Sequence, residues 1–225
     1  MMRTWIEKSK NDWNERATDW HKKSDRMWTS GSRKDVIPVI TEHLAQGSSL
    51  LDVGCGDGVG AYLAAEKGYH VTGIDVSSNM IKLANSRKKK NLSFETGALS
   101  EMEFKNASFD AAMCINSLEW TEDPYKELIE IDRVIRAGGY IFCAILGPAA
   151  APRKNSFNRL TGEQTICNTM MPWELSELTK KLKWEQFDER YVYKEQVDLE
   201  LTKNLPAILK QSLTFFTLFV FSKKS

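Results

Sequence analysis

The sequence predicts an α/β domain with a doubly wound sheet, because strand, glycine loop and helix follow one another in its first half. Residues 50–53 form a short apolar strand, residues 54–60 carry glycine at every second position, and residues 61–67 are helix-prone. A second short strand over residues 69–74 ends at Asp75. In doubly wound sheets, nucleotide-like ligands bind at the junction of strand, glycine loop and helix. We therefore expect such a ligand here.

The register of the glycines indicates which kind of ligand this is. The dinucleotide fingerprint GxGxxG begins directly after its strand, but counted from Gly54 its third position is Val59. Counted from Gly56, the sequence matches the permissive form of the fingerprint, in which alanine, here Ala61, takes the third position. This match starts two residues too late, because Gly54 already ends the strand. Asp52, near the end of the strand, would repel a pyrophosphate at short range. A ligand that carries a positive charge suits this acid better.

This arrangement resembles the first motif of the class I S-adenosylmethionine-dependent methyltransferases, in particular their quinone-methyltransferase-like group (methyltransferase domain type 11). The motif DxGxGxG is present as Asp52, Gly54, Gly56 and Gly58. The resemblance implies that the loop backbone packs on the methionyl part of S-adenosylmethionine and that Asp52 helps to hold its ammonium group. It also implies that Asp75 binds the ribose hydroxyls. Asp75 follows Gly56 at close to the ~20-residue offset of the ribose-binding acid in dinucleotide folds.

Further segments extend the resemblance over about residues 49–147. Residues 76–84 resemble the second helix of that family, with Met80 against the adenine ring, and residues 92–99 resemble its third strand and the turn that closes over adenine. Residues 109–116 resemble its fourth strand, and a helix, a tight turn and a fifth strand follow. The family's sheet has the order 3-2-1-4-5-7-6 with strand 7 antiparallel, so a seven-stranded Rossmann-like mixed sheet with helices on both faces is expected.

One residue departs from the pattern of the resembled group. Its members commonly carry an acid directly after the glycine of the third turn, where it takes the adenine amino group, whereas this chain has Ala98. The backbone of Ala98 and Leu99 could still bind the ring. The cofactor-binding residues predicted in this way, for S-adenosylmethionine and its product S-adenosylhomocysteine, are Asp52, Gly54, Cys55, Gly56, Gly58, Asp75, Val76, Ser77, Met80, Ala98, Leu99, Asn116 and Ser117.

The first 35 residues are expected to form a helical extension. Trp5, Trp13, Trp20 and Trp28 recur at intervals that keep them on one broad side of a helix. This helix is either an arm packed on the sheet edge or a lid over cofactor and substrate, and its position favours the lid. We predict that Trp13, Trp20 and Arg33 face the cofactor, with Arg33 offering a fork to the methionyl carboxylate.

Methyl transfer from a sulfonium requires little acid–base chemistry. The acceptor must be held in line at about 3–3.5 Å, and a base is needed only where the acceptor carries a proton of high pKa. Glu119 and His21 are the candidate bases, and Trp120 is a candidate wall of the acceptor pocket. The alternative for Glu119 and Trp120 is a helix-start acid and a core aromatic residue.

The segment after the fifth strand is predicted to shape the acceptor site. Residues 147–172 form a loop in which Arg153 and Phe157, with Asn158 and Arg159, offer charge and aromatic surface to a small anionic or aromatic molecule. Ordinary loop solubility explains these residues almost as well. The remaining chain is expected to form, in order, a helix, a strand, a helix and a strand over residues 173–182, 184–193, 198–210 and 213–222.

Size and composition favour one α/β domain. Its expected parts are the extension (1–35), the cofactor-binding core (36–147), the substrate-side loop (148–172) and the end of the sheet (173–225). Thirty-one basic and thirty acidic residues give a formal charge of +1, which favours no nucleic-acid partner.

The apolar run 213–221 is too short for stable membrane insertion. Four cysteines without CxxC spacing indicate neither a metal site nor disulfides, and favour a cytoplasmic location. Nothing in the sequence indicates an oligomeric state.

The sequence thus predicts a methyltransferase that moves the sulfonium methyl group to a small-molecule acceptor by in-line displacement. The alternative is a catalytically silent S-adenosylmethionine-binding sensor or partner subunit, which Ala98 and the lack of an evident base favour. A nicotinamide-dependent reductase is a third hypothesis, and the register of the glycines disfavours it.

Overall fold

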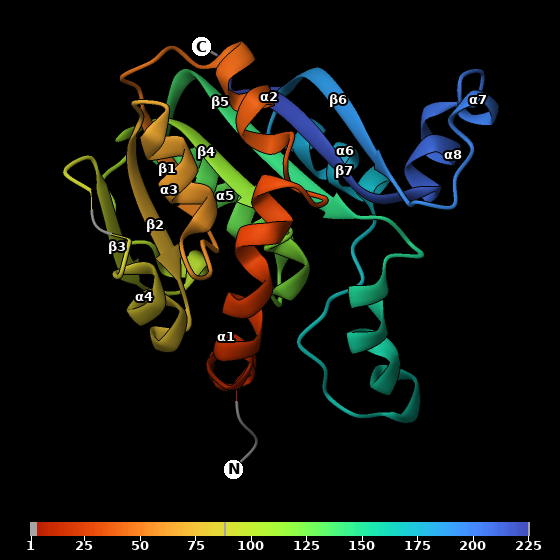
Figure 1. Cartoon of the computed structure of the whole chain (residues 1–225), viewed down its shortest axis with the longest axis horizontal. Coiled ribbons are helices and arrows are strands. Elements are labelled where there is room, and N and C mark those ends of the chain that lie inside the picture. Colours follow the sequence, from red (N-terminus) through yellow and green to blue (C-terminus); the bar gives the residue numbers. More distant parts are fainter. Residues whose placement is uncertain (1–3, 88, 225) are drawn as a thin grey trace.

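A seven-stranded mixed sheet forms the centre of the molecule, as the sequence predicts (Figure 1). The computed structural model describes residues 4–87 and 89–224. The strand order is β3-β2-β1-β4-β5-β7-β6, and β7 is antiparallel to both of its neighbours. The strands are β1 (Ser49–Val53), β2 (His70–Asp75), β3 (Leu92–Thr96), β4 (Phe109–Ile115), β5 (Ile135–Leu146), β6 (Glu185–Tyr193) and β7 (Thr214–Ser222).

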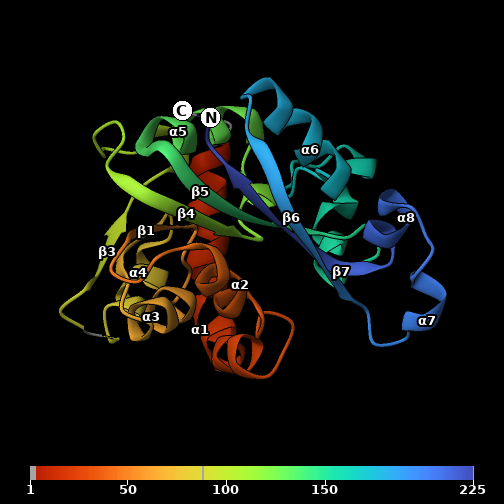
Figure 2. The same cartoon turned by 90° about the horizontal axis from the view of Figure 1, so that it is seen from above.

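Helices cover both faces of this sheet because neighbouring strand residues point to opposite sides. Leu50 belongs to the core beneath α2 and α3, whereas Leu51 belongs to the core beneath α5 and α6. Figure 2 shows these two pairs of helices on opposite sides of the sheet. The helices are α1 (Trp5–Thr29), α2 (Val36–His43), α3 (Val59–Glu66), α4 (Ser78–Ala84), α5 (Pro124–Val134), α6 (Pro172–Lys181), α7 (Leu199–Thr202) and α8 (Ala207–Ser212).

Two segments differ from the sequence-based expectation. The helix expected over residues 198–210 is divided into α7 and α8, because Pro206 lies between them and cannot donate a helical hydrogen bond. The loop expected over residues 147–172 contains the 3-10 helix η3 (Ala151–Thr161). Neither difference changes the sheet.

Within the N-terminal extension, residues 5–29 form a single long helix, α1, that crosses the carboxyl ends of the central strands (Figures 1 and 2). A capping box begins it: the Glu7 N–H donates to Thr4 Oγ1 at 3.2 Å and the Thr4 N–H donates to Glu7 Oε2 at 2.9 Å. The helix packs against α3 and α4. It is therefore placed over the edge of the sheet at which ligands bind in doubly wound folds.

In the described part of the chain, no helix is both long enough and apolar enough to cross a bilayer.

Candidate functional site

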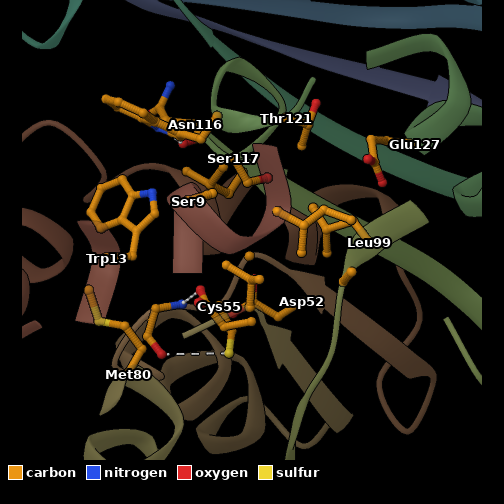
Figure 3. Close-up of a pocket in the computed structure, with 18 of the residues that line it drawn as sticks. Ser9, Trp13, Asp52, Cys55, Met80, Leu99, Asn116, Ser117, Thr121 and Glu127 are labelled. Carbon is orange, nitrogen blue, oxygen red and sulfur yellow. Dashed lines mark hydrogen bonds between the residues drawn. The ribbon is translucent and has the colours of Figure 1, made fainter. Parts of the chain in front are cut away.

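A cavity lies at the carboxyl ends of β1, β2 and β4, under α1 (Figure 3). It leaves about 190 Å³ for the centres of water molecules. The chain order reverses between β1 and β4, and such a switch point is where doubly wound sheets bind ligands. The cavity is lined by Trp5, Ile6, Ser9, Trp13, Trp20, Trp28, Arg33, Asp52, Gly54, Cys55, Gly56, Asp57, Asp75, Val76, Met80, Ala98, Leu99, Ser100, Ile115, Asn116, Ser117, Trp120, Thr121, Glu122, Asp123, Lys126 and Glu127.

The glycine loop forms the floor of this cavity. Gly54 has a φ of +75°, and a Cβ added there would lie 2.5 Å from the Cβ of Ser117 at the end of β4. The loop is tied to the end of β2, because the Gly54 N–H donates to the Ile74 carbonyl at 2.8 Å and the Gly56 N–H donates to Asp75 Oδ2 at 2.9 Å. Glycine at position 54 therefore lets β1 and β4 approach closely beneath the ligand space.

Two carboxyl groups lie on the cavity floor, the buried Asp52 and the partly buried Asp75. Burial and the neighbouring Asp75 raise the pKa of Asp52 to about 8, against the opposing charge of Arg33. Burial raises the pKa of Asp75 to about 6, although the backbone N–H groups of Ser77 and Gly56 favour its charged form. A cation placed beside these acids would stabilise their ionised state. The floor therefore suits a ligand with a positive group.

Arg33 supplies a buried positive charge at the same end of the cavity. Its guanidinium lies 4.9 Å from the ring centre of Trp20 and 5.7 Å from that of Trp28. Burial lowers its pKa to about 10, and Nη2 makes one long hydrogen bond of 3.4 Å to Asn116 Oδ1. Within residues 4–87 and 89–224, its buried Nε finds no hydrogen-bond partner. An anionic group entering the cavity would satisfy this donor.

Indole rings from two distant segments form a wall of the cavity. Trp13 of α1 meets Trp20 of the same helix edge-to-face at 5.6 Å and meets Trp120 at 5.0 Å. Trp120 ends the 3-10 helix η2 (Leu118–Trp120), and its Nε1–H donates to the Asn116 carbonyl at 3.0 Å. The Trp5 Nε1–H in turn donates to the Trp120 carbonyl at 3.1 Å. Trp13 and Trp20, predicted to face the cofactor, and Trp120, a candidate wall of the acceptor pocket, all line this cavity, and their roles in binding stay predictions.

Most of the residues predicted to bind the cofactor line this one cavity. Two do not: Gly58 and Ser77. Gly58 has a φ of +78°, and a Cβ there would lie 2.6 Å from Cζ of Phe94, so this glycine permits close packing of α3 on β3. Ser77 caps α4, accepting from the Met80 N–H at 3.1 Å, and its hydroxyl donates to Asn14 Oδ1 at 2.7 Å. Both residues position the loop and helix beside the cavity.

The two candidate bases lie outside the cavity lining. Glu119 is fully buried, and its Oε1 accepts the Leu146 N–H at 2.6 Å, which joins η2 to β5. Burial also raises the pKa of Glu119. His21 Nδ1 lies 2.6 Å from Asp57 Oδ2, so His21 joins α1 to the glycine loop. The structure gives both residues a bonding role in the fold, and their part in catalysis stays a prediction.

The loop residues expected to face the acceptor are likewise elsewhere. Arg153 is buried, and its Nη2 donates to the carbonyl oxygens of Leu146 and Met170, the latter at 2.5 Å. Phe157 points to solvent with 61 % of its surface exposed. Arg153 therefore ties η3 to the end of β5, because a buried guanidinium needs acceptors and the loop carbonyls supply them.

Glu127 and Asp57 are cavity residues that the sequence reasoning missed. Glu127 stands in helical register with the buried residues Ile131 and Val134, which was a usable signal. Asp57 stands between two motif glycines, and its buried carboxylate accepts from the hydroxyl of Ser24 and pairs with His21. Its partners on α1 could not be seen from the motif.

A second cavity lies on the other side of the indole wall. It leaves about 470 Å³ for the centres of water molecules. Among its lining residues, Trp13, Trp20, Arg33, Asn116 and Trp120 also line the first cavity. The other lining residues come mainly from α1, η3, the end of β5 and the start of β7: Glu15, Arg16, Asp19, Lys23, Met27, Ser32, Leu146, Ala151, Pro152, Lys154, Asn155 and Phe215.

The sheet order, the acid near the end of β1 and the glycine loop under a ligand cavity are the features of a class I S-adenosylmethionine-dependent methyltransferase domain. Residues 51–143, which contain the glycine loop, match the methyltransferase domain family. The cofactor of the class is S-adenosylmethionine.

Curated relatives include O-methyltransferases. The chain is 36 % identical over 135 residues to the O-methyltransferase rstn1 of Aspergillus nomiae, covering 53 % of this chain and 60 % of that protein. It is 33 % identical over 102 residues to a ubiquinone biosynthesis O-methyltransferase of Paracidovorax citrulli, covering 43 % of each chain. The matches thus span about half of the length of these relatives.

Solved structures share the fold over nearly the whole chain. A methyltransferase in complex with the Trm112 methyltransferase activator of Haloferax volcanii superposes with a TM-score of 0.75 at 19 % identity. The match covers 96 % of this chain and 98 % of that one. At this identity the likeness concerns the fold.

The side chains of the first cavity fit S-adenosylmethionine. The buried Nε of Arg33, the buried Oγ of Ser117 and the buried Oε2 of Glu127 all lack hydrogen-bond partners in the described part of the chain. Burial raises the pKa of Asp52, and the positive charge of Arg33 does not offset this effect. A molecule with a carboxylate, an ammonium group, a ribose diol and an adenine offers complements to such groups, since buried polar groups are normally hydrogen-bonded.

Proposed function

We propose that this protein transfers the methyl group of S-adenosylmethionine to a small planar molecule bound in the second cavity. The observation that carries the proposal is the shared wall between the two cavities. On one side of Trp20 and Asn116 lie the glycine loop and the buried charges, and on the other side lies an aromatic pocket. Because the two cavities share these lining residues they adjoin, and we propose that the methyl group and the acceptor atom meet where the two cavities join.

Buried groups at one end of the first cavity would hold the cofactor. Asp52 would accept hydrogen bonds from the ammonium group, and Arg33 would pair with the carboxylate through its free Nε. Asp75, fixed by the Gly56 N–H, would face the ribose. Met80 and Leu99 would contact the base. These roles follow from the positions of the charges around one continuous space.

The second cavity, where we propose that the methyl acceptor binds, is lined by both aromatic and basic side chains. Phe215 lines the second cavity together with the shared indoles, and flat rings pack well against such walls. Three basic residues, Arg16, Lys23 and Lys154, outnumber the acids Glu15 and Asp19 among its lining residues. These features support a small aromatic acceptor with an acidic group. The O-methyltransferase names of the relatives also favour a small-molecule acceptor.

The cofactor supplies an activated methyl group, so the residues of this chain have mainly to orient the two reactants and exclude water. Holding the acceptor atom in line at about 3–3.5 Å from the methyl carbon supplies most of the rate gain available. We propose that α1 acts as a lid, because Trp13 and Trp20 of this one helix line both cavities. The His21–Asp57 pair would hold this lid on the glycine loop.

Calorimetry and a transfer assay together test the proposal. Titration with S-adenosylhomocysteine, S-adenosylmethionine and NADH should show binding of the first two compounds. Methyl-labelled S-adenosylmethionine should then label a metabolite from an extract or from a panel of phenolic acids. Binding without any transfer would support the silent cofactor-binding alternative, and binding of NADH alone would contradict both.

A substitution in the second cavity tests where the acceptor binds. Ala151→Trp places an indole in the second cavity, so the KM for the acceptor should rise about tenfold or more while the affinity for S-adenosylhomocysteine stays unchanged. The matched control is Ala149→Trp, at an exposed position two residues earlier. Equal effects of the two substitutions on KM would argue against this acceptor site.

A further inference from the structure

Helix α5 carries an acid into the first cavity from its otherwise apolar inner face. Glu127 is only 6 % exposed, and it shares the buried side of the helix with Leu128, Ile131 and Val134, which are all fully buried. A carboxyl group is seldom buried to this degree unless it is paired. Its place among core residues therefore calls for a partner.

In the described part of the chain, one oxygen of this carboxyl group lacks that partner. Oε2 of Glu127 is buried and lacks a hydrogen-bond partner throughout residues 4–87 and 89–224. The side chain lines the first cavity, and Figure 3 shows its carboxyl group on the side of the cavity that Leu99 and Thr121 also form. An unpaired buried acceptor of this kind is destabilising, because it has lost its hydrogen bonds to water without gaining a new one. A donor on a bound ligand would remove that cost.

The neighbouring acids do not compete for this role. Oδ1 of Asp123 accepts the N–H groups of Tyr125 and Lys126, both at 3.1 Å, and so caps α5. Glu122 is exposed at the rim of the cavity. Glu127 is therefore the buried acceptor available at this end.

The part of the ligand that reaches this end is the base, given the proposed cofactor. Asp52 and Arg33 define the amino-acid end of the cavity, and Asp75 defines the place of the ribose. The base must then extend towards Ala98 and Leu99. The 3-10 helix η1 (Leu99–Glu101) packs directly against α5, which brings Glu127 to the same region.

We propose that Glu127 selects adenine by accepting a hydrogen bond from its exocyclic amino group. The inference rests on the proposed cofactor. The side chain at position 98 is a methyl group, which cannot accept a hydrogen bond, so an acid from a different element serves the amino group. Hypoxanthine carries a carbonyl oxygen where adenine carries its amino group. This oxygen would face the carboxylate of Glu127, and because both groups only accept hydrogen bonds they would repel each other.

The ionisation of Glu127 decides the conditions of the test. Burial raises the pKa of Glu127 to about 7, with Asp123, Glu130 and Glu101 acting in the same direction and Lys126 acting against them. A protonated carboxyl group could donate to the carbonyl of hypoxanthine. Binding is therefore measured at about pH 8.5, where a free carboxyl group of this pKa is mostly ionised and can only accept.

The experiment compares S-adenosylhomocysteine with S-inosylhomocysteine by calorimetry. The wild-type protein should bind the adenine compound about ten- to hundredfold more tightly. In Glu127→Gln the ratio should fall to about one, because a side-chain amide can accept from an amino group or donate to a carbonyl. Glu101→Gln, an exposed substitution on η1, should keep the wild-type ratio.

Each outcome bears on a separate claim. A wild-type ratio near one, or an unchanged ratio in Glu127→Gln, overturns the role of Glu127 while the proposed cofactor stands. Failure of both compounds to bind overturns the cofactor assignment as well. Thermal unfolding of Glu127→Gln should show no loss of stability, because the substitution removes a buried charge and keeps the shape of the side chain.

Discussion

The proposed role of Arg33 leads to a quantitative prediction for Arg33→Met. This substitution keeps a long apolar side chain between the rings of Trp20 and Trp28 and removes the guanidinium. In the proposed complex, Arg33 makes a charge-assisted hydrogen bond to the methionyl carboxylate. Such bonds contribute about 1.5–3 kcal/mol, which corresponds to a loss of about 10–150-fold in affinity for S-adenosylhomocysteine.

The unliganded protein should tolerate this change. Arg33 is only 7 % exposed, and its guanidinium makes one long hydrogen bond to Asn116. Burial lowers the pKa of this group. Its removal therefore relieves a desolvation cost, and the unfolding temperature should not fall appreciably. A large loss of stability would indicate that the cation–π contacts with the two indoles dominate instead.

Isothermal calorimetry with two ligands isolates the carboxylate contact. 5′-Methylthioadenosine lacks the amino-acid end of the cofactor, so wild type and Arg33→Met should bind it with affinities that agree within about twofold. Arg26→Met, at an exposed position of α1, should leave the affinity for S-adenosylhomocysteine unchanged. The reasoning is refuted if Arg33→Met binds S-adenosylhomocysteine as wild type does, or if it weakens both ligands equally.

Two further predictions concern Asp52 and Gly58. Burial raises the pKa of Asp52 to about 8, and a bound ammonium group would lower it. Binding at about pH 7 should therefore release a proton, and the affinity should rise with pH, by up to about tenfold per unit, until it levels off above the pKa. Calorimetry in buffers of different ionisation enthalpy measures the number of protons released. Asp52→Asn should lower this number, and an unchanged number would contradict the assignment. Gly58→Ala should destabilise the fold by about 2–5 kcal/mol, because its φ is +78° and the new Cβ would lie 2.6 Å from Cζ of Phe94. Gly138→Ala, with a φ of +71° and no atom within 4 Å of its Cβ, should cost only about 1–2 kcal/mol in thermal unfolding, and equal losses would show that strain alone matters.

Much of the cofactor side of the site could be predicted because its signals are local. Asp52, the motif glycines and Asp75 lie at strand ends, and parallel strands bring their carboxyl ends to one edge. The spacing of the tryptophans likewise predicted which side of α1 would face inwards. Even Pro206 carried a readable signal for the break between α7 and α8.

The roles of the buried polar residues could not be predicted in the same way. Glu119 and Arg153 have the residue types of catalytic or binding groups, yet Oε1 of Glu119 accepts the N–H of Leu146 and Nη2 of Arg153 donates to the carbonyl of Met170. Those partners lie 27 and 17 residues away in the sequence. The partners of a buried polar side chain are backbone atoms of any residue type, so no motif announces them.

The sequence by itself determined the place of the glycine loop and of the acids at the strand ends, because these depend on residue spacing and on backbone preferences that act over short stretches of chain. The class of the domain and the order of its strands were expected from the resemblance of these motifs to a known family. Only the tertiary structure decided that Trp13 and Trp20 of α1 line two adjoining cavities, and that Oε2 of Glu127 faces the first one with no hydrogen-bond partner in the described part of the chain. Desolvation and hydrogen bonding depend on the atoms that folding brings near a group, and these atoms come from segments far apart in the chain.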